Sequence, residues 1–365
     1  MSKRPRLMAL RFLLAMVCFA ASCAYAEPYL AVQTGLKCTQ CHVNPTGGGL
    51  RGAYGDVFAQ TALPATHLDT GADTWTGSLN TFLRVGGDLR TEAEATEVPH
   101  SKTISQFSLE QVRTYVEAQV IPERLIVYAD EQIAPGGALN REAYVLYWSP
   151  GHDWYVKAGQ MYLPFGWRLQ DQSAFVLQAS GINMTTPDQG VEFGWLKGHW
   201  DAQLDVSNGT AGGPVSDSRK EFSSQVQYVE SIWRVGLAAN YNDKLGGSRG
   251  AYGLFGGLRT GPISWLAEVD AVEDKSVGVD QGRTLATLLE GNWLIARGNN
   301  LKVTAEYLDP DRSVQNNGQT RWSVVYELTP IQFLQVRTGV RYYDGIPQID
   351  TQHTRQYFVE LHGFF

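Results

Sequence analysis

Two cysteines and a histidine stand together near the start of the chain, in the run Cys38-Thr39-Gln40-Cys41-His42. In an exported protein, a C-x-x-C-H run is typical of a covalent c-type haem site: both thiols add to the haem vinyl groups and the histidine ligates the iron. Two intervening residues let both sulfur atoms reach one macrocycle from a single helical turn. The run therefore predicts one covalent haem c on Cys38 and Cys41, with His42 as the proximal iron ligand.

Two other uses of paired cysteines fit this segment less well. A thioredoxin-like redox pair would need a βαβ context, and a zinc site would need a second pair of ligands. The segment shows neither pattern, and no cysteine follows Cys41. The two thiols therefore have only each other or a haem as a partner.

An export leader would direct the chain to the compartment in which haem is attached. Basic residues precede and abut the apolar run 12–21, and Ala24-Tyr25-Ala26 then gives the small-x-small cleavage pattern of a secretory signal peptide. We predict a signal peptide over residues 1–26 and a mature chain that begins at Glu27. A lipoprotein with Cys23 as its lipidated residue is the weaker alternative, because the Ala-Tyr-Ala site lies immediately downstream.

The charge of the mature chain limits its partners. Removing the leader takes 4 of the 30 Lys and Arg and none of the 37 Asp and Glu, which leaves a formal charge of −11. Such an acidic chain is a poor candidate for nucleic-acid binding, so no nucleic-acid partner is expected. Mean hydropathy is −0.23. This average does not detect a transmembrane β-barrel, because such a barrel places its apolar residues on alternate positions.

From residue 75 onward, short segments alternate between apolar and polar residues. Over 321–328 the aromatic and aliphatic side chains occupy one face, and Arg, Ser and Glu occupy the other; 334–342 repeats this pattern. Charges on one face and apolar groups on the other suit strands with lipid outside and water inside. A soluble β-sandwich, the alternative, would not predict charged inner faces in strand after strand.

The connections between these segments alternate in length. Seven tight turns, the last at Thr329-Pro330, alternate with eight longer polar loops, among them Ala134–Asn140, Asn242–Arg249 and the longest at Pro164–Asp188. Fifteen connections imply about sixteen strands, an even number as in bacterial outer-membrane barrels. We therefore predict an all-β protein whose residues 73–365 form a transmembrane antiparallel β-barrel in the outer membrane, with the short turns and the N-terminus on the periplasmic side.

Residues 27–72 are predicted to form a small c-type haem module of loops, a short helix and a linker. Leu50, Tyr54, Val57 and Phe58 share one helical face, which could cover a haem or pack on the barrel wall. About 46 residues cannot build a core unaided, so the haem or the barrel interior must complete it. We expect this module to plug the lumen.

The sequence leaves the identity of the second axial ligand of the haem iron undecided. We favour His67, because it is nearest in sequence and lies in the linker after Pro64, with Met184 of the longest loop and Met161 as alternatives. The remaining candidates are His100, His152, His199, His353 and His362.

Taken together, the haem motif and the barrel pattern resemble the fused monohaem cytochrome–porins of the bacterial outer membrane, which are best known as ferrous-iron oxidases. The local match covers about residues 29–58, with Gln33-Thr34-Gly35 before the haem motif and a Gly-rich loop after it. Leu163-Pro164-Phe165-Gly166 also resembles general bacterial porins. The resemblance implies electron transfer, with extracellular Fe(II) or another donor and a periplasmic c-type cytochrome or other carrier as partners.

Two other functions remain open beside electron transfer. One is a porin for small solutes whose haem-bearing plug acts in redox sensing or gating. The other is a haem enzyme such as a peroxidase, which would need an open iron position with distal acid and base groups, and no sequence motif marks one.

Overall fold

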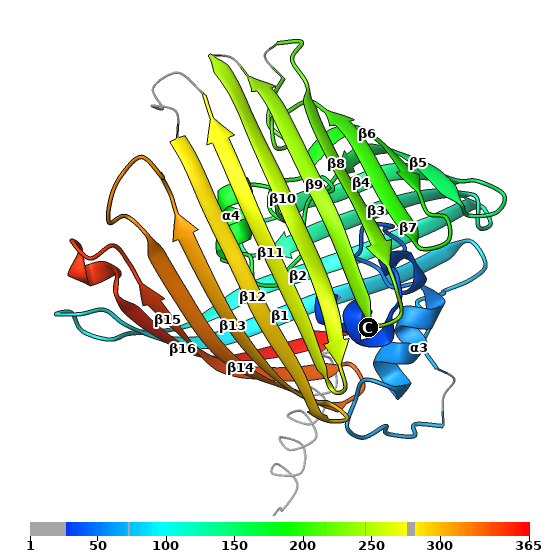
Figure 1. The fold of residues 1–365 in the computed structure, drawn as a ribbon. Helices are drawn as coiled ribbons and strands as arrows, with labels where there is room; N and C mark the ends of the chain where they lie inside the picture. Colours follow the sequence, from blue (N-terminus) through cyan, green and yellow to red (C-terminus); the bar gives the residue numbers. More distant parts are fainter. Residues whose placement is uncertain (1–26, 72–73, 216, 245, 276–281) are drawn as a thin grey trace, which may run out of the picture.

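The computed structural model describes residues 27–71, 74–215, 217–244, 246–275 and 282–365. The predicted leader at 1–26 and most of the predicted loop at Glu273–Gly282 lie outside these ranges. The described ranges form one closed ring of antiparallel strands, in which each strand pairs with its neighbour in sequence (Figure 1). Strands β1 and β16 close the ring, with a register that runs from Asp88 opposite Phe364 to Glu97 opposite Arg355.

The sixteen strands of the described residues are, in chain order, β1 (Leu83–Glu97), β2 (Ile104–Ile121), β3 (Leu125–Ala134), β4 (Leu139–Trp148), β5 (Trp154–Met161), β6 (Asp188–Trp195), β7 (Trp200–Ser207), β8 (Glu221–Val229), β9 (Trp233–Lys244), β10 (Gly247–Thr260), β11 (Ile263–Asp274), β12 (Gly282–Ala296), β13 (Asn299–Asp309), β14 (Gln319–Ile331), β15 (Leu334–Asp344) and β16 (Thr354–Phe364). The helices are α2 (Pro28–Thr34), α3 (Ala53–Thr61) and α4 (Phe175–Ser180), with 3₁₀ turns η1 (Cys38–Gln40) and η2 (Asp350–Gln352). None of the helices in the described ranges has the length and apolar character needed to cross a membrane.

The predicted all-β barrel of about sixteen strands is confirmed, with local differences in the connections. Thr329 and Pro330 lie inside β14, and the turn falls at residues 332–333 instead. Proline has no N–H for the ladder, so the β14–β15 register shifts there without ending the strand. The loops predicted at Ala134–Asn140 and Asn242–Arg249 are also short, because polar residues continue the strands at their ends.

The two faces of the strands follow the predicted alternation. On β14, Trp322 is 57 % exposed on the outside, whereas the neighbouring Arg321 is 1 % exposed on the inside. On β16, Val359 is 46 % exposed and Glu360 is 5 % exposed. The outside of the ring is thus the apolar surface that a transmembrane barrel presents to lipid.

The inner wall differs from the water-facing surface that the sequence pattern predicts. Arg337 is buried, and its guanidinium lies 3.1 Å from a carboxylate oxygen of Glu360 and 3.3 Å from one of Glu327. Lys302 adds a 3.1 Å contact to Glu327. These charges pair with one another because two segments of the chain fill the lumen and cover them.

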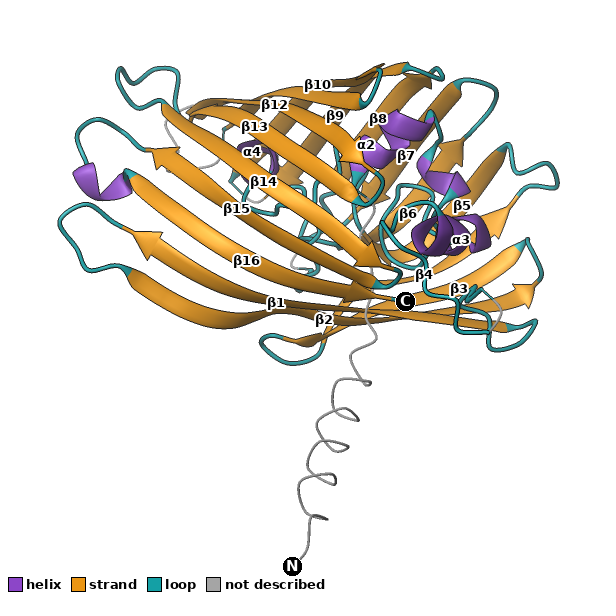
Figure 2. Cartoon of the chain, turned by 90° about the horizontal axis from the view of Figure 1, so that it is seen from below, coloured by secondary structure: helices purple, strands orange, loops and turns teal. Residues whose placement is uncertain are grey.

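One of these segments is the N-terminal segment, residues 27–71, and the other is the lumen loop, residues 162–187, which includes α4. Figures 1 and 2 show α2 and α4 inside the wall of strands, with α3 at the end of the barrel that carries the short turns. Helix α2 packs on β10 and β11, and α4 packs on β11, β12 and β13. Tyr29 and Val32 of α2 share one buried apolar cluster with Phe165, Trp167 and Phe175 of the lumen loop. The two segments therefore form a joint core inside the barrel.

We expect a change on the outer face of β15 to test the lipid assignment. Val340→Arg should destabilise the barrel by about 2–4 kcal/mol near the bilayer midplane, whereas Thr338→Val on the same outer face should be tolerated. Denaturant unfolding in lipid vesicles measures both effects. Equal stability of the two variants would contradict the lipid-facing assignment.

Candidate functional site

The haem-motif residues are brought together by a single tight turn. In η1 the N–H groups of Cys41 and His42 both donate to the carbonyl of Cys38, at 3.1 and 3.0 Å. His42 then pairs with Arg51 in an isolated antiparallel bridge, which folds the chain back on itself. Cys38, Cys41 and His42 consequently lie beside one another, as the spacing predicts.

The Gly-rich loop after the motif is needed for close approach. Gly47, Gly48 and Gly49 have φ values of 87°, 81° and 63°, in the left-handed region that favours glycine. A Cβ on Gly49 would lie 2.2 Å from the hydroxyl of Tyr128, and one on Gly47 would lie 3.3 Å from the Cys38 sulfur. The loop thus passes tightly between the barrel wall and the haem motif.

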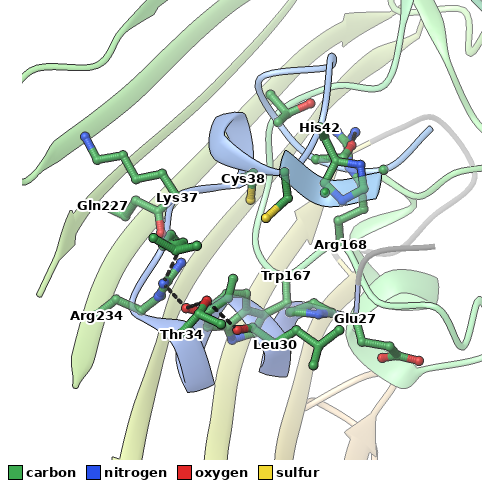
Figure 3. Close-up of a pocket in the computed structure, with 18 of the residues that line it drawn as sticks. Glu27, Leu30, Thr34, Lys37, Cys38, His42, Trp167, Arg168, Gln227 and Arg234 are labelled. Atoms are coloured by element: carbon green, nitrogen blue, oxygen red, sulfur yellow. Dashed lines mark hydrogen bonds between the residues drawn. The ribbon is translucent and has the colours of Figure 1, made fainter. Parts of the chain in front are cut away.

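Cys38, Cys41 and His42 all line one cavity at the turn end of the lumen, shown in Figure 3. Its empty volume is about 1220 Å³, part of which is open to solvent. Apolar walls come from Leu30 of α2 and Phe58 of α3, and from Phe165, Trp167 and Phe255 of the lumen loop and β10. Mostly apolar cavities with a few polar groups are the usual form of cofactor sites.

The ionisation states of the three motif residues suit a permanent ligand site. Burial raises the pKa of the Cys38 thiol, and burial together with the nearby Cys38 raises the pKa of Cys41 to about 11. Reactive thiolate pairs show the opposite shift. Burial, and then the Arg51 guanidinium, lower the pKa of His42 to about 3, which keeps its imidazole neutral. Its Nδ1 is buried without a hydrogen-bond partner in the described part of the chain.

Two cationic side chains of the cavity are placed for an anionic ligand group. Arg234 of β9 is 3 % exposed and donates through Nη2 to the carbonyls of Ala31 and Leu36, at 2.6 and 2.8 Å. Its Nη1 is buried and has no partner among the described residues. Arg168 of the lumen loop donates to the Gly47 carbonyl at 2.8 Å. A buried guanidinium N–H without a partner is costly unless a bound group accepts from it.

The residues present fit a covalently attached haem. Two thiols and an imidazole stand on one turn, the cavity beside them is mostly apolar, and the guanidinium groups of Arg234 and Arg168 are of the charge that carboxylates of a bound haem would need. Arg234 and Arg168 were missed by sequence reasoning, because an inward arginine among many others carries no distinguishing signal. Only the fold identifies them as part of the cavity.

The structure does not place His67, the second ligand preferred from the sequence, in the cavity. Met184 is 5 % exposed and lines the same cavity as His42. His67 does not line it: its Nδ1 lies 3.0 Å from the Gln60 carbonyl. The linker around His67 is pinned to the barrel rim by the N–H of Ala65, which donates to the Thr329 carbonyl at 2.8 Å. Met161 is fully buried in a separate aromatic cluster and also lies outside the cavity.

The predicted apolar face of the short helix is divided between two environments. Tyr54 and Phe58 line the cavity, and their rings stack with centroids 6.4 Å apart. Leu50 instead packs in the aromatic cluster of the barrel wall, and Val57 is 39 % exposed. Half of the predicted face therefore covers the candidate site.

Buried polar contacts fasten the N-terminal segment to the barrel wall. The Asn44 amide donates to both carboxylate oxygens of Glu142, at 3.0 and 2.9 Å. Glu27 lies 2.9 Å from the Lys302 ammonium, and both side chains are almost fully buried. These contacts fix the position of the cavity relative to the strands.

Two ion pairs fasten the lumen loop to the barrel wall and provide a pH test. Asp171 of the lumen loop lies 3.0 Å from Arg321 and 3.5 Å from Arg341. Burial alone would raise the pKa of Asp171, but these two guanidinium groups hold it well below its usual range. The pairing therefore stabilises the folded loop at neutral pH, and this contribution begins to fall below the ordinary Asp pKa near about 4 and decreases progressively toward the lower pKa of the folded protein.

We expect Asp171→Asn to loosen the lumen loop by about 1.5–3 kcal/mol at pH 7, because a charge-assisted contact is lost. The rate of protease cleavage within residues 162–187 measures this. Asp217→Asn is the control, because Asp217 pairs with Arg219 in a different, more exposed loop. Wild type and Asp171→Asn should converge as the pH falls below about 4. A constant difference between them across this range would contradict the assignment.

A comparison with protein-family models and with characterised protein sequences found no match. Solved structures do resemble the chain. OprB of Pseudomonas putida has a TM-score of 0.65 at 10% sequence identity, over 84% of this chain and 100% of that one. An anion-selective porin from Comamonas acidovorans has a TM-score of 0.61 at 9% identity, over 78% and 99%. A loop-deletion mutant of OmpT, an outer membrane protein of Vibrio cholerae, has 0.60 at 11%, over 78% and 99%. The chain therefore has the fold of outer-membrane porins, a closed antiparallel barrel of sixteen strands.

Proposed function

We propose that this protein is an outer-membrane electron-transfer protein that carries one covalent c-type haem in the turn end of its barrel. The observation that carries the proposal is the cavity in which Cys38, Cys41 and His42 meet. When bound there, haem would supply a one-electron couple between ferric and ferrous iron. In this proposal the two thiols would hold the macrocycle and His42 would ligate the iron.

The surrounding residues would position the haem and limit its contact with water. Phe58, Trp167 and Phe255 would lie against the macrocycle, and the unpaired Nη1 of Arg234 would donate to one of its carboxylates. The contacts of Asn44 with Glu142 and of Glu27 with Lys302 would hold the site at a fixed place in the lumen.

The apolar outer surface supports a location in the bacterial outer membrane, with membrane lipid as one partner. The cavity lies at the end of the barrel with the short turns, which face the periplasm in outer-membrane barrels. The N-terminus would then be periplasmic, where haem is attached. A periplasmic c-type cytochrome or other carrier would approach from this side.

In this proposal an external donor would have to reach the haem through the lumen. A bilayer core of roughly 30 Å insulates the periplasm from the outside, and the cavity lies at the turn end of the ring of strands. The lumen loop lines part of the cavity and would lie on this route. Extracellular Fe(II) is the donor implied by the resemblance to cytochrome–porins.

A channel for small solutes, with the N-terminal segment as a redox or gating plug, is the second candidate. It is favoured by the fold, since two of the similar structures are described as an anion-selective porin and as an outer membrane channel of Acinetobacter baumannii. A barrel of sixteen strands is wide enough to hold an aqueous channel.

The test uses the full-length protein, produced with a c-type maturation system and purified in detergent. We expect a haem-stained band on a denaturing gel, a reversible one-electron redox titration, and reduction of the oxidised protein by added ferrous iron. Protein without covalent haem would overturn the proposal. Covalent haem that ferrous iron leaves oxidised would overturn iron as donor, and large conductance in planar bilayers would favour the channel.

A further inference from the structure

The lumen loop contacts the Gly-rich loop that follows the haem motif. Arg168 of the lumen loop donates to the Gly47 carbonyl at 2.8 Å. Gly47 lies close to Cys38, since a Cβ added at Gly47 would be 3.3 Å from the Cys38 sulfur. Pro164, Phe165, Trp167 and Met184 of the same loop line the cavity. The barrel portion of the chain thus contributes a complete side of the candidate haem site.

Met184 is held in place by its backbone and by burial. Its N–H donates to the Gln172 side-chain oxygen at 2.9 Å, and the following turn is closed by Thr185, whose N–H donates to Asn183 Oδ1 at 2.7 Å. The Met184 side chain is 5 % exposed and packs on the buried Tyr162. A thioether in such a dry position can remain bound to a metal without competition from bulk water.

The other histidines and methionines of the described residues are positioned elsewhere. Apart from His42, none of them except Met184 lines the cavity. Three of these histidines contact backbone carbonyls: His67 that of Gln60, His152 that of Glu123 and His199 that of Val229. The other three lie near side chains: His353 near the Asp344 carboxylate, His362 near the Gln335 amide oxygen and His100 near Asp350. Met161 is buried in the barrel wall.

We infer that the Met184 thioether would be the second protein ligand of the haem iron, together with His42. The inference rests on the proposed haem site and adds the ligand that the barrel supplies. A methionine and histidine pair raises the reduction potential relative to ligation by nitrogen alone, which suits acceptance of electrons from a weak reductant. It would also clamp the lumen loop to the N-terminal segment.

The test compares Met184→Leu, Met184→His and the control Met161→Leu in the full-length, haem-loaded protein. Leu conserves the volume of Met, so packing is kept while the thioether is lost. We expect Met184→Leu to lose the sulfur-to-iron charge-transfer band of the oxidised protein and to shift its iron to high spin. Met184→His should restore low spin and lower the midpoint potential, and Met161→Leu should match wild type.

Different results overturn the ligand inference and the haem site. If all three variants retain covalent haem and Met184→Leu keeps the wild-type spectrum, Met184 is not the ligand while the haem site stands. The same holds if His67→Ala, but not Met184→Leu, changes the spin state. Wild-type protein without haem would overturn both the inference and the proposed function. Loss of haem staining in Met184→Leu alone would also overturn the inference, because the thioether links do not depend on the axial ligand.

Discussion

The double variant Cys38→Ala, Cys41→Ala should carry no covalent haem, and each single variant should lose most of it. Each thiol forms one of the two thioether links, and both sulfur atoms lie on the wall of the same cavity. Haem staining after denaturing electrophoresis, normalised to protein, measures the effect directly.

Thr39→Ala is the matched control for these variants. Thr39 lies between the two cysteines on the same 3₁₀ turn, is half-buried and does not line the cavity, so its loss should leave haem content unchanged. The folded barrel of every variant should show the same heat-dependent shift in gel mobility. Equal haem staining in the double variant and in wild type would contradict covalent attachment at this motif.

Deleting residues 27–70 while keeping the leader should raise single-channel conductance severalfold. The N-terminal segment fills the turn end of the lumen and shares a buried core with the lumen loop, so its removal leaves only the loop inside the ring. A ring of sixteen strands without such a plug encloses an aqueous channel. The same deletion should abolish electron transfer between an external donor and an internal acceptor in proteoliposomes.

The matched control removes residues 346–352, which belong to the connection between β15 and β16 and do not line the cavity. Its conductance should match that of wild type. Conductance that stays at the wild-type level after deletion of residues 27–70 would place the N-terminal segment outside the conducting path. Retained electron transfer would show that the haem motif is not required for it.

Some features of this protein follow from spacing along the chain alone. The alternation over 321–328 predicted which face of β14 is outside, because side chains on a strand point to opposite faces with a period of two. The same alternation, with the turn residues between segments, predicted sixteen strands and a closed antiparallel barrel. The C-x-x-C-H run predicted that Cys38, Cys41 and His42 lie together, because one tight turn fixes their relative positions.

Features that depend on long-range contacts were not predictable in this way. Arg234 lies 198 residues from Leu36, whose carbonyl accepts its hydrogen bond, so no local pattern could place it in the cavity. His67 was preferred as second ligand for its short distance in sequence. The structure pins its linker to the rim and brings Met184 into the cavity from the lumen loop instead.

The sequence by itself determined the number of strands, the faces of those strands and the grouping of the motif residues, since these follow from patterns within single turns and strands. Only the tertiary structure decided which segments fill the lumen. Their positions in turn decide how the inner wall is buried and where the cavity lies. Arg337 is buried with Glu327 and Glu360 on the inner wall, beside Gln170 of the lumen loop, rather than facing solvent. The walls of the cavity around His42 likewise come from segments that meet only when the ring of strands has closed.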